Sequence, residues 1–179
     1  MPLLPQIRDQ PPARNTEGLS TFSFPGNMIR SEVTGFIFVV IVGSVLHFTY
    51  EASGKLWWVG TFSAMNESVW EHLKLAFWPA LAWSLIQRAQ LPERKHNFWP
   101  AKALALALMP VLIAVGYYSY TAALGHHVLV IDLMLFCGAV AIGQSAAIGV
   151  RKIELKGTAS NVIAKFVIAL EALAFSVLG

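Results

Sequence analysis

Two carboxylates, an imidazole and an ammonium group stand close together in residues 66–74, where the sequence reads NESVWEHLK. Glu67 and Glu71 are four residues apart, so on a helix both side chains would project from one face and repel each other. Lys74, a protonated histidine, a shared proton or a bound divalent cation would each relieve that repulsion. The segment that follows is apolar as far as about Gln87, so these groups stand at the edge of a membrane span, where an ionised side chain needs a partner.

Further polar side chains are expected to join this stretch. His47 and Glu51 lie four residues apart near the end of the preceding apolar segment and would also share a helix face. Histidine nitrogen combined with carboxylate oxygen is a ligand set for zinc or another first-row divalent metal, and the same residue types can relay protons. We expect Glu71 and His47 to be direct ligands. The predicted metal ligands are His47, Glu51, Glu67, Glu71 and His72, and the predicted pocket-lining residues are Lys74, Tyr118, Asp132 and Glu171.

Several of these residues also have a purely structural interpretation. Glu67 at a helix start can serve as a cap or complement the helix dipole, and Glu71 can form an ion pair with Lys74. His126 and His127 fit a solvated turn, and the tyrosines just before them fit an aromatic belt at the membrane surface. The functional and the structural interpretations of the cluster both stay open at this point.

Composition indicates the class of fold that must position these residues. Of the 179 residues, 56% are hydrophobic and only 13% are charged, whereas soluble domains carry about 25% charged residues. Several apolar runs approach the length that crosses a bilayer as a helix, and a lone strand cannot pair its backbone groups in hydrocarbon. We therefore expect an all-α, polytopic transmembrane helical bundle in residues 31–179, after a flexible cytoplasmic tail in residues 1–30. The expected spans cover about 33–50, 67–87, 99–123, 128–148 and 160–178.

Local signals refine these five spans. Asn66 or Ser63 is the expected N-cap of the second span, and Pro79 and Pro110 are expected to kink the second and third spans. The second span is the weakest of the five because its front is charged. A count of four spans would leave that segment in the membrane interface.

The distribution of basic residues predicts the orientation of the bundle. With five spans, Lys55 and Lys74 fall on one side, and the other 11 of the 13 lysines and arginines fall on the opposite side. The positive-inside rule then places the N-terminus in the cytoplasm and the His/Glu cluster outside, with the plasma membrane as the expected location. The inner half is expected to hold little beyond snorkelling cations such as Lys102 and Lys165.

The sequence also argues against several function classes. Cys137 is the only cysteine, so neither an intrachain disulfide nor a cysteine-cluster metal site can form. Common catalytic signatures such as Gly-x-Ser-x-Gly, a phosphate-binding glycine loop or His-Glu-x-x-His are missing. The basic loops lack the interleaved aromatic residues expected of a nucleic-acid surface, and orientation in the bilayer accounts for them.

Five strings together resemble a known family. They are LHFTYEASG at 46–54, VGTFS at 59–63, NESVWEHLK at 66–74, NFWPAKA at 97–103 and the stretch 117–125. They are similar to a family of small, mostly bacterial polytopic membrane proteins known only as a domain of unknown function. The resemblance covers roughly residues 30–150. It implies the fold and a membrane location, and it implies no activity.

Three functional hypotheses follow from these residues. The leading one is a small ion-binding or transport protein whose outward-facing His/Glu cluster holds a cation or relays protons. The alternative is a membrane-embedded enzyme that acts on a lipid or isoprenoid substrate by carboxylate acid/base or metal-assisted chemistry. In the third hypothesis the charges pair with each other and only close the bundle. The expected partners are the lipid bilayer and a small ion or lipid-like ligand, with no nucleic acid.

Overall fold

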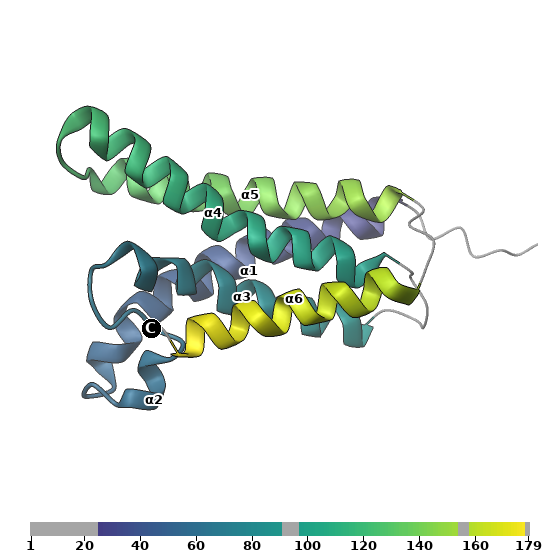
Figure 1. Ribbon diagram of the computed structural model, residues 1–179, viewed down its shortest axis with the longest axis horizontal. Coiled ribbons are helices and arrows are strands. Elements are labelled where there is room, and N and C mark those ends of the chain that lie inside the picture. Colours follow the sequence, from purple (N-terminus) through teal and green to yellow (C-terminus); the bar gives the residue numbers. More distant parts are fainter. Residues whose placement is uncertain (1–24, 91–96, 154–157, 178–179) are drawn as a thin grey trace, which may run out of the picture.

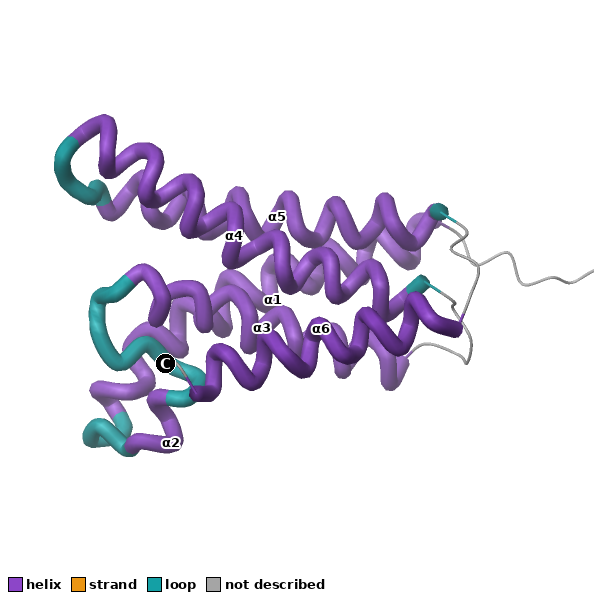
Figure 2. Tube along the Cα trace, viewed as in Figure 1, coloured by secondary structure: helices purple, strands orange, loops and turns teal. Residues whose placement is uncertain are grey.

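The structure, a computed structural model, describes residues 25–90, 97–153 and 158–177. These residues form helices joined by turns and contain no strand, so the prediction of an all-α fold is confirmed. The long helices of the described residues run side by side along one axis (Figures 1 and 2). The helices are α1 (Pro25–Ala52), α2 (Trp57–Gly60), α3 (Val69–Gln90), α4 (Phe98–Leu124), α5 (Leu129–Lys152) and α6 (Thr158–Val177).

Four helices within the described residues are long and apolar enough to cross a membrane: α1, α4, α5 and α6. This pattern defines an integral membrane protein. The fifth long helix, α3, has 22 residues but carries Glu71, Lys74 and Arg88. It is the segment whose charged front made it the weakest predicted span. Even so, α3 packs between α1 and α4 within the bundle, and its Glu71 and Lys74 are buried.

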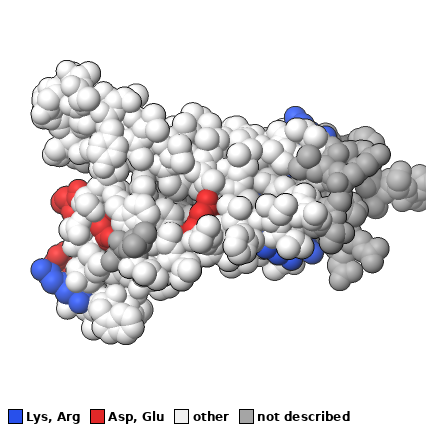
Figure 3. All heavy atoms as spheres, in the orientation of Figure 1, with Lys and Arg blue, Asp and Glu red and all other residues white. Residues whose placement is uncertain are grey.

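Contacts between helices define a central helix and two ends of the bundle. Helix α4 packs against α3, α5 and α6, and α1 packs against α3 and α5. One end, called here the α2 end, holds α2, the turn between α4 and α5, and the last turn of α6 (Figure 1). The opposite end holds the first turns of α1, α4 and α6. On the face shown in Figure 3, charged side chains gather mostly towards these two ends.

Small residues let the helices approach closely, as is common between helices in membranes. A Cβ atom added at Gly43 of α1 would lie 2.6 Å from the carbonyl oxygen of Leu75 in α3. One added at Gly143 of α5 would lie 3.2 Å from the carbonyl oxygen of Ala105 in α4. Large apolar side chains such as Ile41 instead point outward, where a bilayer would solvate them.

Some boundaries differ from those expected. Helix α1 begins at Pro25, so residues 25–30 are helical rather than part of a tail, and the rest of the predicted tail lies outside the described residues. Pro79 and Pro110 both lie inside unbroken helices. The short helix α2 was not expected. Its Trp57 and Trp58 are both exposed, in keeping with a position at the membrane surface.

The opposite end contains a buried polar network that the sequence did not lead us to expect. Glu32 of α1 forms ion pairs with Lys102 of α4 at 2.7 Å and with Arg151 of α5 at 3.0 Å. The Nε2 atom of Gln87 in α3 also donates to Glu32 Oε1 at 3.3 Å. The expectation that Lys102 snorkels is therefore wrong, because this side chain is buried beside a carboxylate. Lys165 instead lies with its Nζ atom 5.6 Å from the centre of the Trp99 ring.

Candidate functional site

The segment that leads into α3 is held against α1 by a serine. Ser63 is fully buried; its hydroxyl donates to the carbonyl oxygen of Leu46 and accepts the backbone N–H of Tyr50 at 3.0 Å. These bonds fix the loop beside the last turns of α1. Residues 61–68 consequently lie next to the helix that carries His47.

Ser68 caps the start of α3. Its hydroxyl accepts the backbone N–H of Glu71 at 3.3 Å, which is the usual geometry of an N-cap. Asn66 Oδ1 accepts the backbone N–H of Ser68 at 2.9 Å, so Asn66 shapes the turn before the helix. The expected cap at Asn66 or Ser63 is therefore wrong by a few residues, because Ser63 is used against α1.

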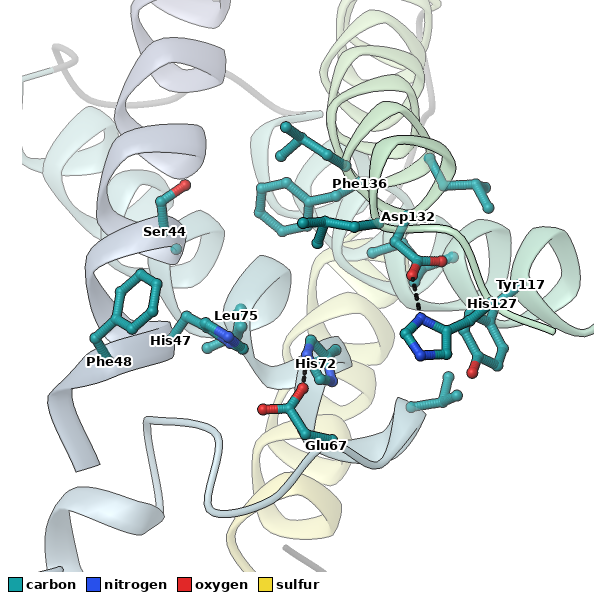
Figure 4. A pocket seen from close by; sticks show the side chains of 16 residues that line it. Ser44, His47, Phe48, Glu67, His72, Leu75, Tyr117, His127, Asp132 and Phe136 are labelled. Carbon is teal, nitrogen blue, oxygen red and sulfur yellow. Dashed lines mark ion pairs between the residues drawn. The ribbon is translucent and has the colours of Figure 1, made fainter. Parts of the chain in front are cut away.

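His47, Glu67 and His72 come together at the α2 end. His47 projects from α1, Glu67 from the loop and His72 from the first turn of α3, and the three point towards one another (Figure 4). One ligand atom from each residue lies within 4.8 Å of the other two. His72 Nε2 is 3.5 Å from Glu67 Oε2, and the two imidazole rings are 5.2 Å apart between centroids. We call these three residues the His/Glu triad.

Hydrogen bonding fixes which nitrogen of His72 faces Glu67. Its Nδ1 atom lies 2.8 Å from the carbonyl oxygen of Ser68, which can only accept, so Nδ1 carries the hydrogen. The other nitrogen, Nε2, then faces the carboxylate of Glu67 either as a protonated donor or as a lone pair. Two acceptors facing each other need a cation between them. In metal sites, a ligating histidine commonly donates the hydrogen of its other ring nitrogen to a backbone carbonyl, as Nδ1 of His72 does here.

A pocket of about 440 Å³ adjoins the triad between α1, α3, α4 and α5. Most of its wall is apolar, and Leu75, Ile113 and Phe136 contribute to it. The polar residues that line it are Ser44, His47, Glu67, His72, Tyr117, His127 and Asp132. The pocket thus has polar groups on two sides and an apolar wall between them.

The second polar side of the pocket lies at the turn between α4 and α5. His127 Nδ1 is 3.5 Å from Asp132 Oδ2 (Figure 4). The Tyr120 hydroxyl donates to Asp132 Oδ1. The backbone N–H of Val128 donates to the Tyr120 oxygen at 3.2 Å, which ties the turn together. Asp132 was expected in the pocket and does line it. His127 and Tyr117, which we expected in a solvated turn and an aromatic belt, line the pocket as well. The short sequence interval between His127 and Asp132 was a signal that could have indicated this position for His127.

Glu71, expected to be a direct ligand, lies outside the triad. Its carboxylate is buried and forms an ion pair with Lys74 Nζ at 2.7 Å, while accepting the backbone N–H of Met65 at 2.8 Å. Lys74 Nζ also donates to the carbonyl oxygen of Gly60 at 2.7 Å. The ion-pair interpretation therefore describes both residues, and Lys74 is not among the pocket-lining residues. The pair instead fixes the loop 60–65 to α3.

Three further residues lie away from the pocket lining. Glu51 is exposed and pairs with Lys55 at 3.4 Å, one turn along the same chain segment. Tyr118 points outward and is 63% exposed. Glu171 is half-buried on α6, and its Oε2 atom has no hydrogen-bond partner in the described part of the chain. Residues four apart on a helix share a face, but the packing of the other helices decides whether that face meets the pocket.

An all-helical membrane protein with a histidine–carboxylate cluster beside an apolar pocket is the class that this fold and geometry define. The chain belongs to the family of unknown function DUF6512, whose family model matches residues 27–177. The expected membership of a domain family without a known activity is confirmed, and the match extends from α1 through α6. Comparison with curated proteins and with solved structures finds no match.

Proposed function

We propose that this protein binds a first-row divalent metal ion, with zinc as the reference case, at the His/Glu triad. The observation that carries the proposal is that two imidazoles and a carboxylate from three separate segments converge within 4.8 Å. Histidine nitrogen and carboxylate oxygen are ligands that zinc and its neighbours accept. Other membrane charges nearby, such as Glu71 and Lys74, are already paired with each other.

The triad needs only small adjustments to hold such an ion. Bonds of about 2.0–2.1 Å in a tetrahedral site place the ligand atoms about 3.3 Å apart. The Glu67 side chain is 86% exposed, so its rotamer can change at little cost. His72 is already oriented by Ser68. Three protein ligands would leave one coordination position open towards the pocket, as in zinc sites that exchange a water or a substrate.

Charge distribution supports a site on the outer face of the plasma membrane. Lys55 and Lys74 are the basic residues of the described chain at the α2 end, and Lys74 is neutralised by Glu71. Arg88, Arg151 and Lys152 belong to the opposite end. Under the positive-inside rule the triad would meet cations from outside the cell. We therefore infer a role in capturing a divalent cation at the outer surface, either for transport or as a bound cofactor.

Metal content and affinity test this proposal directly. The detergent-purified protein is loaded with Zn²⁺, desalted and measured by elemental analysis, and its affinity is measured by competition with a chromophoric chelator. We expect near-stoichiometric zinc in the parent protein. His47→Ala and His72→Ala should each weaken binding by at least about 100-fold, since loss of a single outer-shell partner already costs about 10–100-fold.

Two exposed residues at the same end serve as matched controls. Glu51→Gln removes a carboxylate that, within the part of the chain that the structure describes, pairs only with Lys55, and His126→Ala removes an imidazole of the α4–α5 turn. Both should keep the parent affinity. Zinc bound equally well by His47→Ala, His72→Ala and the parent would refute the triad as the site. Absence of zinc, manganese, cobalt and nickel binding would refute the metal site and leave a proton relay, an acid catalyst or a purely structural charge network.

Binding should also depend on pH, because a histidine must be deprotonated to bind a metal. As the pH falls from about 8 to about 5, the range in which ordinary histidines gain a proton, zinc affinity should fall. The same titration on His126→Ala should give the same curve. An affinity that does not change with pH would argue against histidine ligands.

The apolar wall of the pocket favours a second candidate function. An open coordination position facing Leu75, Ile113 and Phe136 suits a membrane-embedded metalloenzyme whose substrate is a lipid or isoprenoid. Conversion of a labelled lipid by the zinc-loaded protein, lost in His72→Ala, would support this candidate. Turnover that is equal with and without zinc would refute it.

A further inference from the structure

We propose that the pocket binds a single-chain fatty acid, with the carboxylate head group between the metal-loaded triad and His127 and the chain against the apolar wall. This inference rests on the proposed metal site and adds the class of ligand. It follows from three features of the pocket: its two polar sides, its apolar wall and its exposed rim. Each feature restricts the occupant in a different way.

The two polar sides call for a compact anion. A metal ion at the triad would carry a double positive charge opposed by the carboxylate of Glu67, so the triad would keep a net positive charge, with Asp132, the other carboxylate of the lining, on the opposite side of the pocket. On the other side, Asp132 accepts the hydroxyl of Tyr120, and its Oδ2 atom lies 3.5 Å from His127 Nδ1. His127 lines the pocket, and a ring nitrogen that carries a hydrogen can donate it to a bound anion. A carboxylate can bind the metal through one oxygen and accept a hydrogen bond through the other.

The apolar wall calls for a hydrocarbon body. Between the two polar sides the pocket is lined by Leu75, Ile113, Leu133, Leu135 and Phe136. A hydrated metal ion alone would leave this surface in contact with water. A volume of about 440 Å³ lies in the range of sites for small ligands, about 300–1,000 Å³, and favours one chain over the two chains of a phospholipid.

The rim of the pocket points to entry from the membrane. Phe48 of α1 and Leu129 and Leu133 of α5 line the pocket and are also 68%, 77% and 55% exposed. These side chains belong to helices that are apolar enough to cross a bilayer. The pocket is therefore bordered by residues that lipid chains would contact. An acid dissolved in the membrane can reach it without passing through water.

Binding of radiolabelled palmitate to the protein in detergent, measured by scintillation proximity with and without Zn²⁺, tests the inference. Three competitors separate its elements. Methyl palmitate has the chain without the charge, butyrate has the charge without the chain, and hexadecyl phosphate has the same chain with a phosphate head. We expect zinc-dependent binding of palmitate, weak competition by methyl palmitate and butyrate, and weaker competition by hexadecyl phosphate than by unlabelled palmitate.

Variants separate the pocket from the metal. Ser44 lines the pocket and is exposed, and among the described residues its hydroxyl bonds only to the carbonyl of Val40 in its own helix, so Ser44→Trp should fill the pocket without disturbing the core. We expect it to abolish palmitate binding and to retain zinc. Ser145→Trp is the matched control, because Ser145 is likewise exposed, bonds only to Ala141 and is not a lining residue. His127→Ala should weaken palmitate binding by about tenfold and retain zinc.

The outcomes distinguish this inference from the proposed function. Zinc binding by the parent protein without palmitate binding would overturn the inference and leave the metal site standing. Zinc binding by neither the parent nor the controls would overturn both. Palmitate that binds equally without zinc, or equally to Ser44→Trp, would place the lipid elsewhere and overturn the inference. Tighter binding of hexadecyl phosphate would show that a phosphate-bearing lipid is the ligand.

Discussion

Glu32 lies in α1 and accepts hydrogen bonds from side chains of three other helices. Lys102, Arg151 and Gln87 reach it from α4, α5 and α3. Its carboxylate is 1% exposed, so each partner replaces water that the oxygen atoms have lost. The network holds two cations and one carboxylate and so depends on that single negative charge.

Removing the charge of Glu32 should destabilise the protein more than removing either cation. Glu32→Gln would leave Lys102 and Arg151 buried without a counter-charge, at a cost of about 3–5 kcal/mol. Lys102→Met should cost less, because Arg151 would still pair with Glu32. Unfolding in detergent, followed by circular dichroism against temperature and dodecyl sulfate, gives the order. Equal losses for both variants and for the exposed control Glu51→Gln would contradict the network's role.

Neighbouring residues of α3 have different roles because successive side chains project about 100° apart around a helix. Glu71 and Lys74 point into protein and pair with each other, whereas His72, next to Glu71, points to the pocket. Figure 4 shows His72 directed towards His47 and Glu67. A single turn of helix thus supplies both a structural ion pair and a candidate ligand.

At the scale of elements, the triad depends on how closely α1 approaches α3. Gly43 lies one turn before His47, at the point where a Cβ atom would meet the backbone of Leu75. A backbone carbonyl cannot move aside as the end of a flexible side chain can. The distance between His47 and His72 is therefore set by a residue that is itself no ligand.

Gly43→Ala should weaken zinc binding although it changes no ligand. The added methyl group would lie 2.6 Å from Leu75 O, so α1 must shift and carry His47 away from His72. We expect at least about a tenfold loss of affinity, since a shift of 1.4 kcal/mol in binding suffices for that. Gly149→Ala is the control, because a Cβ atom there has open space around it. Parent-like affinity in Gly43→Ala would show that the helix approach does not position the triad.

The two ends of the whole molecule differ in kind. The α2 end holds a pocket lined by titratable side chains, with Glu67 and His127 exposed to solvent. At the opposite end, Glu32 is buried and accepts hydrogen bonds from the buried side chains of Lys102 and Gln87, which belong to other helices. Within the described residues, the pocket therefore lies at one end of the bundle and the buried ion pairs lie near the other.

Labelling of introduced cysteines should show which end faces outward. In a Cys137→Ser background, Gly54→Cys and His126→Cys place thiols at the α2 end, and Arg88→Cys and Lys152→Cys place them at the opposite end. A membrane-impermeant maleimide added to intact cells should label the first pair and spare the second, as the positive-inside rule requires. A permeant maleimide must label all four. The reverse pattern would put the triad in the cytoplasm.

Sequence by itself determined the class of fold, and its five predicted ligands included all three residues of the triad. Apolar runs of membrane length must form helices, since in hydrocarbon only local backbone hydrogen bonds are available to a single segment. His47, Glu67 and His72 were identifiable because ionisable groups at the edge of such a run need partners. Family membership also followed from the strings around them, and the matched family extends that resemblance to residues 27–177.

Tertiary structure alone decided which charges meet. Glu32 contacts Lys102 and Arg151, which lie 70 and 119 residues further along the chain, so no local spacing could pair them. The tertiary structure also gives Glu67 and Glu71 different partners, although the two lie only four residues apart. Glu71 pairs with Lys74, which also bonds to the carbonyl oxygen of Gly60, whereas Glu67 belongs to the triad. Helical periodicity fixes which side chains share a face. Only the packing of the other helices decides whether that face meets a pocket, a counter-charge or the lipid.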